Sequence, residues 1–158
     1  MATRSTIALE FADGTIGQVY CHWDGYLSHN GKILFENYSN PFILRDLIDL
    51  GDLSSLAPTI GTKHPFDNPG MFDTPAYQAY KDQYGNMCKF YGRDRSEHNV
   101  YARYFKDFAD YRANGQAEEY DYILRNVDGV ATWFVSDHGG EFILLTEAFA
   151  KEAEEENA

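Results

Sequence analysis

The residues best suited to chemistry lie in the stretch YCHWDGY, Tyr20 to Tyr26, which holds three aromatic side chains, a thiol, an imidazole and a carboxylate. The stretch comes where a predicted strand ends, so it is either a binding corner or the corner of a core. Residues two apart on a strand face the same way, so His22 and Asp24 could meet to hold a metal or orient a general base. Such a pair is more often a hydrogen-bonded corner, and we predict neither a metal ligand nor a catalytic residue here.

The chain has two cysteines, Cys21 and Cys88. Two cysteines without paired spacing indicate neither a disulfide framework nor a structural zinc site. Adjacent strand residues face opposite ways, so His22 cannot activate the neighbouring thiol, although His29 or His64 could. The sequence contains no glycine-rich phosphate loop, serine elbow or zincin motif. We therefore predict that the protein is not an enzyme and uses no cofactor, and that Cys21 is a buried free thiol.

A second cluster is YGRDR, Tyr91 to Arg95, directly before a predicted helix. Gly92 permits an unusual backbone angle, and two arginines flank Asp94. Helix N-terminal amides and guanidinium groups together favour an anion such as phosphate. The alternative is structural: Asp94 caps the helix, while Arg93 and Arg95 pair with neighbouring carboxylates.

The two clusters together resemble the parts of a nucleotide site. Aromatic faces stack on a base, and forked arginine donors hold phosphates. We therefore predict a site for a nucleotide-like small molecule. Its residues are Trp23, Asp24, Tyr26, Tyr91, Arg93 and Arg95.

The charge balance limits the classes of partner that the protein can bind. Twenty-five acidic against thirteen basic residues give a formal net charge of −12. This charge repels phosphate backbones and provides no basic membrane anchor, so we expect no direct binding to nucleic acid or membrane. No apolar run approaches the ~20 residues that span a bilayer, and no secretory signal is visible. We expect a soluble intracellular protein whose acidic surface can dock on a protein built to hold nucleic acid.

The length of 158 residues suits one domain over 1–158. Apolar residues alternate over 5–11 and again over 16–23, with an Asp13-Gly14 turn between them. This pattern predicts a β-hairpin that delivers the YCHWDGY stretch to its end.

Two helices are predicted next. Apolar spacing predicts one over about 27–38, and Asn40 can cap a second that starts at Pro41 and ends near Gly51. Residues 58–90 are rich in proline and turn formers, which predicts a long irregular excursion with one short helix near 76–84.

Aromatic residues at three-and-four spacing from Tyr101 to Tyr111 predict a strong helix that Asp94 or Ser96 caps and Asn114-Gly115 ends, with its aromatic stripe in the core. Three apolar segments, YDYILRN, VATWFV and EFILL, then predict a meander. Thr146 is the expected cap of a last helix, whose acidic end over 151–158 opposes the helix dipole and should fray. The predicted fold is α+β: an antiparallel sheet of about five strands, the N-terminal hairpin plus the C-terminal meander, packed with about four helices.

The segments WDGY, GDLSSL and YGRDR resemble a family of small phage and prophage proteins, most clearly over the first 56 residues. The resemblance implies a phage-type accessory protein in the host cytoplasm. Two functions fit. The first is a non-enzymatic counter-defence protein that sequesters a nucleotide-like immune signal. The alternative is an acidic DNA mimic of the anti-CRISPR or anti-restriction type, which occupies the nucleic-acid-binding surface of a host defence complex. The sequence does not indicate an oligomeric state.

Overall fold

The predicted N-terminal hairpin is confirmed, and it forms the middle of the sheet. In the computed structural model, which describes residues 2–157, β1 (Ser5–Glu10) pairs antiparallel with β2 (Ile16–Cys21). Asp13 holds the turn because its carboxylate accepts from the Thr15 backbone N–H at 3.0 Å and from the Thr15 hydroxyl at 2.6 Å. Gly14 supplies the left-handed residue, with φ of +88°.

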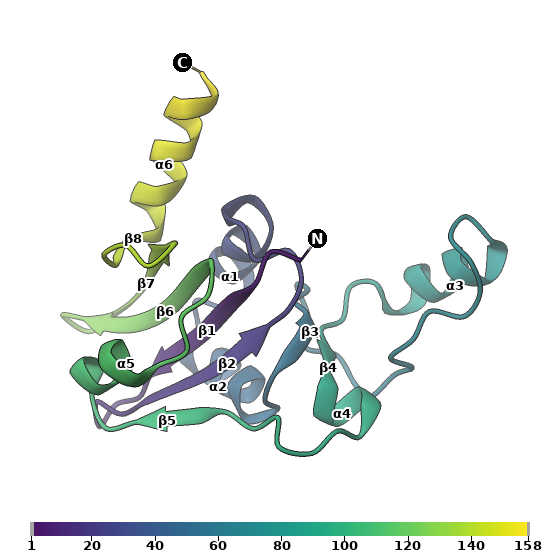
Figure 1. The fold of residues 1–158 in the computed structure, drawn as a ribbon, viewed down its shortest axis with the longest axis horizontal. Helices are drawn as coiled ribbons and strands as arrows, with labels where there is room; N and C mark the ends of the chain where they lie inside the picture. The colour runs from purple at the N-terminus through teal and green to yellow at the C-terminus, as the bar shows by residue number, and fades with distance from the viewer. Residues whose placement is uncertain (1, 158) are drawn as a thin grey trace.

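The sheet runs β4-β3-β2-β1-β6-β7-β8, and β5 pairs with the free part of β2 (Figure 1). The further strands are β3 (Leu53–Ser55), β4 (Lys89–Phe90), β5 (Arg103–Phe105), β6 (Tyr120–Val127), β7 (Val130–Asp137) and β8 (Ile143–Leu144). The α+β class is confirmed, but the sheet has eight strands instead of about five. It is also mixed, because β1–β6 and β2–β3 are parallel. The strands missed by the prediction, β3, β4 and β5, are too short to show alternation.

Six α-helices and one π-helical turn are present in the described residues, where about four helices were predicted. They are η1 (Leu27–Gly31), α1 (Lys32–Asn37), α2 (Pro41–Asp49), α3 (Pro75–Tyr84), α4 (Tyr91–Arg95), α5 (Phe108–Asn114) and α6 (Leu145–Glu156). The predicted helix over 27–38 is the continuous pair of η1 and α1. The Asn40 cap of α2 is confirmed, since its side chain accepts from the Phe42 backbone N–H at 2.9 Å.

Both faces of the sheet are buried, because helices pack on each of them. Helices α1 and α2 and the first turns of α6 pack on the larger core, whose members include Ile7, Val19, Leu34, Leu47 and Tyr122. Helix α5 packs on the smaller core, which comprises Ala8, Ile16, Tyr111 and Ile123. Alternate residues of the central strands therefore serve two cores, and this explains why polar side chains on these strands are also buried.

The helix predicted across 101–111 is wrong in its first part, whereas its last part and its end at Asn114-Gly115 are confirmed by α5. Residues 103–105 form β5 and pair with β2, and a new helix begins at Phe108. Asp107 starts that helix by accepting from the Asp110 backbone N–H at 2.8 Å, whereas Ser96 ends α4 with φ of +57°. The expected aromatic stripe is split, because Tyr101 is 69% exposed and only the later aromatic residues reach the smaller core. Residues 103–105 form a strand because they pair with the free edge of β2, although their aromatic spacing is that of a helix.

The C-terminal meander of β6, β7 and β8 is confirmed. Helix α6 begins at Leu145 with Leu144 as its N-cap, so the predicted Thr146 cap is wrong. The helix continues to Glu156, and fraying of the acidic end stays a prediction; residue 158 of that end lies outside the described residues. Phe149 packs edge-to-face on Phe35 with ring centroids 5.8 Å apart, which anchors the helix one turn before the acidic segment.

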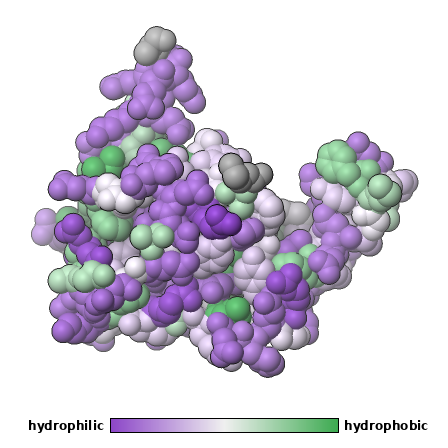
Figure 2. Space-filling view, viewed as in Figure 1, coloured by the Kyte–Doolittle hydropathy of each residue, from purple (hydrophilic) through white to green (hydrophobic). Residues whose placement is uncertain are grey.

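Part of the predicted excursion, residues 60–86, projects from the body as an arm that carries α3 (Figure 1). Its two ends are tied together, since Cys88 N–H donates to the Thr59 carbonyl at 2.8 Å. Apolar residues gather on the arm at the right of Figure 2, where Met71 and Phe72 are 79% and 74% exposed. Over residues 2–157, no helix combines the length and apolarity needed to cross a membrane.

Candidate functional site

The YCHWDGY stretch forms an exposed aromatic corner beyond the end of β2. The chain continues along β3, and Trp23 N–H donates to the Ser54 carbonyl at 3.0 Å. The Trp23 ring stands edge-on to His22, with ring centroids 4.7 Å apart, and is 44% exposed. His22 Nδ1 lies 2.7 Å from the Tyr20 hydroxyl. The imidazole is therefore engaged with a tyrosine on its own strand face, and the indole is free to contact a partner.

Asp24 breaks the strand geometry. Its φ of +57° is left-handed, and its backbone carbonyl accepts from Asn30 N–H at 3.2 Å. Because β2 ends at Cys21, strand alternation no longer brings Asp24 beside His22, and no contact between their side chains is found in residues 2–157. Gly25 follows with its N–H donating to the Thr3 carbonyl at 2.8 Å, and a Cβ there would lie 2.7 Å from Ser5 Cβ. The corner is thus held by backbone contacts.

The predicted site residues fall into two groups. Tyr26 lies beside His29, with ring centroids 5.9 Å apart, on the η1 side of the corner. Tyr91 lies on the β3 side, where its backbone N–H donates to the Asp52 carbonyl at 3.2 Å, and burial raises the pKa of its hydroxyl. Within residues 2–157, no direct hydrogen bond, ion pair or ring contact joins Tyr26 to Tyr91.

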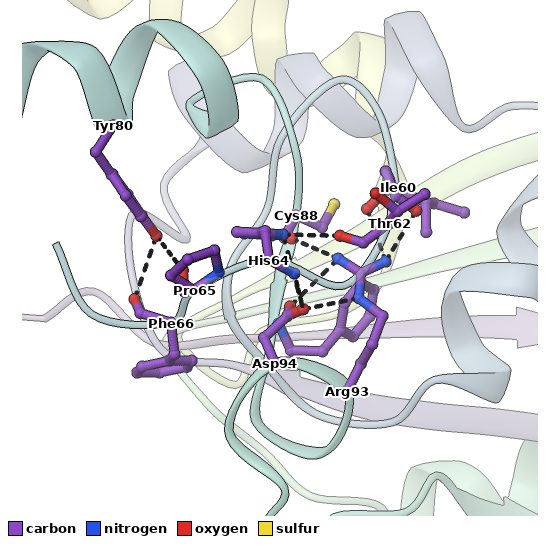
Figure 3. A network of polar contacts seen from close by, with 11 residues as sticks. Ile60, Thr62, His64, Pro65, Phe66, Tyr80, Cys88, Arg93 and Asp94 are labelled. Atoms are coloured by element: carbon purple, nitrogen blue, oxygen red, sulfur yellow. Dashed lines mark hydrogen bonds and ion pairs between the residues drawn. The ribbon is translucent and has the colours of Figure 1, made fainter.

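Arg93 is fully engaged inside the protein (Figure 3). Its Nε donates to Asp94 Oδ1 at 3.0 Å, and Nη2 donates to Asp94 Oδ2 at 3.2 Å. The remaining donors reach three carbonyls at 3.0 Å each, those of Ile60, Gly61 and Cys88. The guanidinium therefore clamps the base of the arm to α4, and its hydrogen-bond donors are already used.

Asp94 completes this clamp from the other side. Its side chain is buried, and it accepts from the Phe90 backbone N–H at 2.8 Å and from the His64 backbone N–H at 3.2 Å. His64 stacks on Tyr84 of α3, with ring centroids 5.2 Å apart. The pairing of Arg93 with a neighbouring carboxylate matches the structural alternative, but the predicted cap is wrong, because YGRDR is itself helix α4 and its N-cap is Phe90, without a side-chain cap bond. Arg93 and Asp94 instead position the arm.

Arg95 is the more accessible arginine of the pair. Its Nε donates to Glu97 at 2.6 Å, and about half of its side chain remains exposed. The guanidinium lies over two rings, 4.3 Å from the Phe66 centroid and 5.0 Å from the Tyr91 centroid. The Arg95 guanidinium and the rings of Phe66 and Tyr91, which are tilted by 33° to one another, make a cationic–aromatic surface.

Neither cysteine is available for chemistry. Cys21 and Cys88 are buried and unpaired with one another. Burial raises the pKa of Cys21 to about 12, and burial likewise raises that of Cys88. Both stay protonated at neutral pH, so neither supplies a thiolate nucleophile. Within residues 2–157, no three His, Cys, Asp or Glu side chains converge in a manner suited to a metal ion.

Two polar regions lie outside the predicted site. One is the acidic end of the molecule around α6, and the other is a buried carboxylate, Asp121, on the β6 face toward α5. A signal for Asp121 was present in YDYILRN, because strand alternation puts this single acid on the same face as Ile123. The signal for α6 was its run of glutamates, which was interpreted only as a frayed end.

Comparison of the chain with models of protein families found no matching family, and comparison with curated proteins and with solved structures found no match to either. The candidate functions therefore depend on the geometry of these regions.

Proposed function

We propose that this chain is a non-enzymatic, phage-type counter-defence protein that acts in the host cytoplasm by docking its acidic α6 end on a basic surface built to hold nucleic acid. One observation carries the proposal. Residues 137–156 contain seven carboxylates and one lysine, a net charge of −6, which is half of the formal net charge of −12. Figure 1 places this segment along β8 and the projecting helix α6, and Figure 2 shows hydrophilic residues along that helix.

The carboxylates converge on one cleft. A hollow of ≈370 Å³ between α6 and the ends of β6 and β7 is lined by four carboxylates against one lysine, Lys151, together with apolar residues; the carboxylates are those of Asp137, Glu141, Glu152 and Glu155. Partial burial raises the pKa of Glu152, and the neighbouring carboxylates of Glu156, Glu155 and Asp137 raise it further. Acids that repel one another in the free protein gain when a basic partner neutralises them, so this cleft favours lysine or arginine side chains.

An apolar groove lies beside the acidic cleft. It has a volume of ≈380 Å³, runs between α1 and α6, and is lined by Phe35 and Phe149 with Glu36, Glu152 and Glu156 around them. Phe35 is 42% exposed. An aromatic centre within a charged rim is the usual anatomy of a protein–protein interface. The partner that fits is a protein whose basic groups surround an apolar contact, which free nucleic acid does not offer.

The sequestering alternative has less support. It needs Arg93 and Arg95 to hold phosphates together, but Arg93 spends its donors on Asp94 and three backbone carbonyls. Arg95 with Tyr91 and Trp23 could still contact one aromatic ligand. This leaves the aromatic corner as a secondary contact surface, and α6 as the main one.

The test is protection of phage from host defence. Cells that carry a CRISPR or a restriction system are challenged with a targeted phage while they express the wild-type chain or the variant Glu152→Lys/Glu155→Lys. Wild type should raise the efficiency of plating, and the variant should lose most of that gain because two charge reversals repel a basic partner. With the purified defence complex, association should slow steeply between low and physiological salt, where the screening length is ~8 Å.

The matched control is Asp46→Lys/Asp82→Lys, which makes the same change of charge at exposed positions on α2 and α3. It should protect as wild type does. Equal loss in both double variants would show that net charge alone matters and would contradict an α6 interface. No protection by wild type against any such system would contradict the function itself.

A further inference from the structure

A cavity opens on the smaller core of the molecule, away from α6 and its groove. It has a volume of ≈160 Å³ and is walled by Tyr111, Gln116, Asp121, Ser136 and Phe142, among others, from α5, β6, β7 and the loops beside them. An apolar cavity of about 150 Å³ is enough to hold benzene. This space therefore fits one six-membered ring, and its walls are polar.

Two buried groups on this wall have unused hydrogen-bonding capacity. The Tyr111 hydroxyl is buried and makes no hydrogen bond of good geometry in residues 2–157, although burial raises its pKa and the nearby Thr6 side chain lowers it; Tyr111 is only 3% exposed. Asp121 is 5% exposed, and its two carboxylate oxygens accept different numbers of hydrogen bonds. Its Oδ1 accepts from the Thr6 hydroxyl at 2.6 Å and from Glu118 N–H at 3.1 Å, whereas Oδ2 has only Glu118 N–H at 3.3 Å. Buried polar groups are nearly always paired, so this pattern points to a missing ligand.

The carboxylate is held in place from behind. Gln18 Nε2 donates to Thr6 Oγ1 at 3.0 Å and to the Gln116 carbonyl at 2.8 Å. Gln116 N–H donates back to Gln18 Oε1 at 3.0 Å. This network fixes the side of Asp121 that faces the core, so its second oxygen is left in a defined position for an incoming donor.

A second cavity shares two walls with the first. It has a volume of ≈230 Å³ and is lined by Arg112, Arg125, Phe108, Phe134, Glu141 and Phe142, of which Arg112 and Phe142 also line the first cavity. Arg125 pairs with Glu10 at 3.0 Å, while no ion pair of Arg112 is found in residues 2–157. One free guanidinium thus stands between a ring-sized space and a second space next to it.

We propose that these neighbouring cavities, which share Arg112 and Phe142 as walls, bind a pyrimidine nucleotide whose ring carries an exocyclic amino group, with the ring in the first cavity and the phosphate at Arg112. Asp121 Oδ2 accepts from the amino group, as aspartate does from N4 of cytosine. The Tyr111 hydroxyl donates to an acceptor of the ring, and Phe142 offers a face for stacking. The proposal does not depend on α6 docking, because its ligand is a small molecule and its four contacting side chains lie outside the acidic cleft, although Glu141 lines both that cleft and the second cavity.

The test is isothermal titration calorimetry of the full chain with CMP, UMP, AMP and cytidine. CMP should bind, and UMP should bind about tenfold to a hundredfold more weakly, because its carbonyl faces the carboxylate where CMP has an amino group. AMP should be excluded, since its two fused rings exceed the first cavity. Cytidine should bind more weakly than CMP because it has no phosphate for Arg112.

Three variants separate a binding role from a structural one. Asp121→Asn should lose the preference for CMP over UMP, because its amide can donate to the uracil carbonyl. Tyr111→Phe should bind CMP about tenfold more weakly and yet fold normally, since its hydroxyl has no partner to lose. Arg112→Gln should bring CMP down to the affinity of cytidine, while the control Arg95→Gln should leave every affinity unchanged.

No binding of any of the four ligands at millimolar concentration would overturn the proposal. Equal affinities of CMP and UMP, or CMP binding that Asp121→Asn and Tyr111→Phe leave unchanged, would overturn it as well.

Discussion

Two buried carboxylates in this molecule invite opposite conclusions. Asp94, in the clamp at the base of the arm, sits in a motif that resembles an anion site, yet it is paired with Arg93 and two backbone N–H groups. Asp121, beside the cavity, sits in an unremarkable strand, and its partners are a neutral hydroxyl and one backbone N–H. Residue types such as those around Asp94 indicate where a ligand could bind. Only a buried group with unused hydrogen-bonding capacity, such as Asp121, can still bind one.

Breaking the clamp should have the largest effect. Arg93→Ala leaves the buried Asp94 without its cation, and we expect a loss of about 3–5 kcal/mol in the free energy of unfolding. The measurement is urea denaturation followed by tryptophan fluorescence. Arg95→Ala is the matched control and should cost no more than ~1 kcal/mol, because Arg95 forms an exposed ion pair. If the two variants lose similar free energies of unfolding, the buried pair of Arg93 with Asp94 does not stabilise the protein more than the exposed pair of Arg95 does.

The second prediction concerns pH. Burial raises the pKa of Asp121 to about 6, from 3.8, although the bonds from Thr6 and Glu118 lower it. A carboxyl with a raised pKa binds its proton more tightly in the folded state, so its contribution to stability falls as pH rises from ~4 to ~6. Relative to wild type, Asp121→Asn should therefore gain on the order of 2–3 kcal/mol between pH 4 and pH 7.

The check on this second prediction is the difference between the two unfolding free energies at each pH, since all other titrating groups cancel in that difference. A difference that stays constant across this range would mean that Asp121 does not titrate near pH 6. The contrast with Asp94 would then lose its electrostatic basis.

The smallest predicted effect compares two buried tyrosines. The Tyr38 hydroxyl donates to the Ala57 carbonyl at 2.7 Å, whereas the Tyr111 hydroxyl has no partner among the described residues. Tyr38→Phe should cost about 1–1.5 kcal/mol, because it leaves a buried carbonyl with one fewer donor. Tyr111→Phe should be neutral or slightly stabilising. Thermal unfolding of both variants under one condition is sufficient, and an equal cost would indicate that the Tyr111 hydroxyl is satisfied in solution.

Local signals predicted much of the fold. The hairpin follows from alternation around Asp13-Gly14, and α2 follows from the Asn40-Pro41 start. Each depends on residues within a few positions of one another. The strands β3, β4 and β5 could not be predicted in this way, because two or three residues become a strand only when a distant edge pairs with them. The same edge converted part of the predicted helix at 101–111 into β5.

The candidate sites were harder to predict for the same reason. Composition indicated Arg93, but whether a guanidinium is free depends on carbonyls such as that of Ile60, 33 positions away. The cavity depends on Thr6 meeting Asp121, 115 positions apart. Trp23 is exposed and Arg95 lies over Tyr91, while their role in binding stays a prediction. The left-handed backbone of Asp24 did not follow from any strand pattern.

The parallel pairing of β1 with β6 has a consequence for how the chain folds. Ser5 is aligned with Tyr120, so the central strand waits for a partner that is made 115 residues later during synthesis. Such non-local pairing slows folding, since the entropy of closing a long loop is lost before the strands gain contacts. Until then the nascent hairpin exposes the β1 edge, which other chains could join. A ribosome-bound chain that stops before residue 120 should therefore be recognised by chaperones as incomplete, whereas one that extends past β7 should resist a protease.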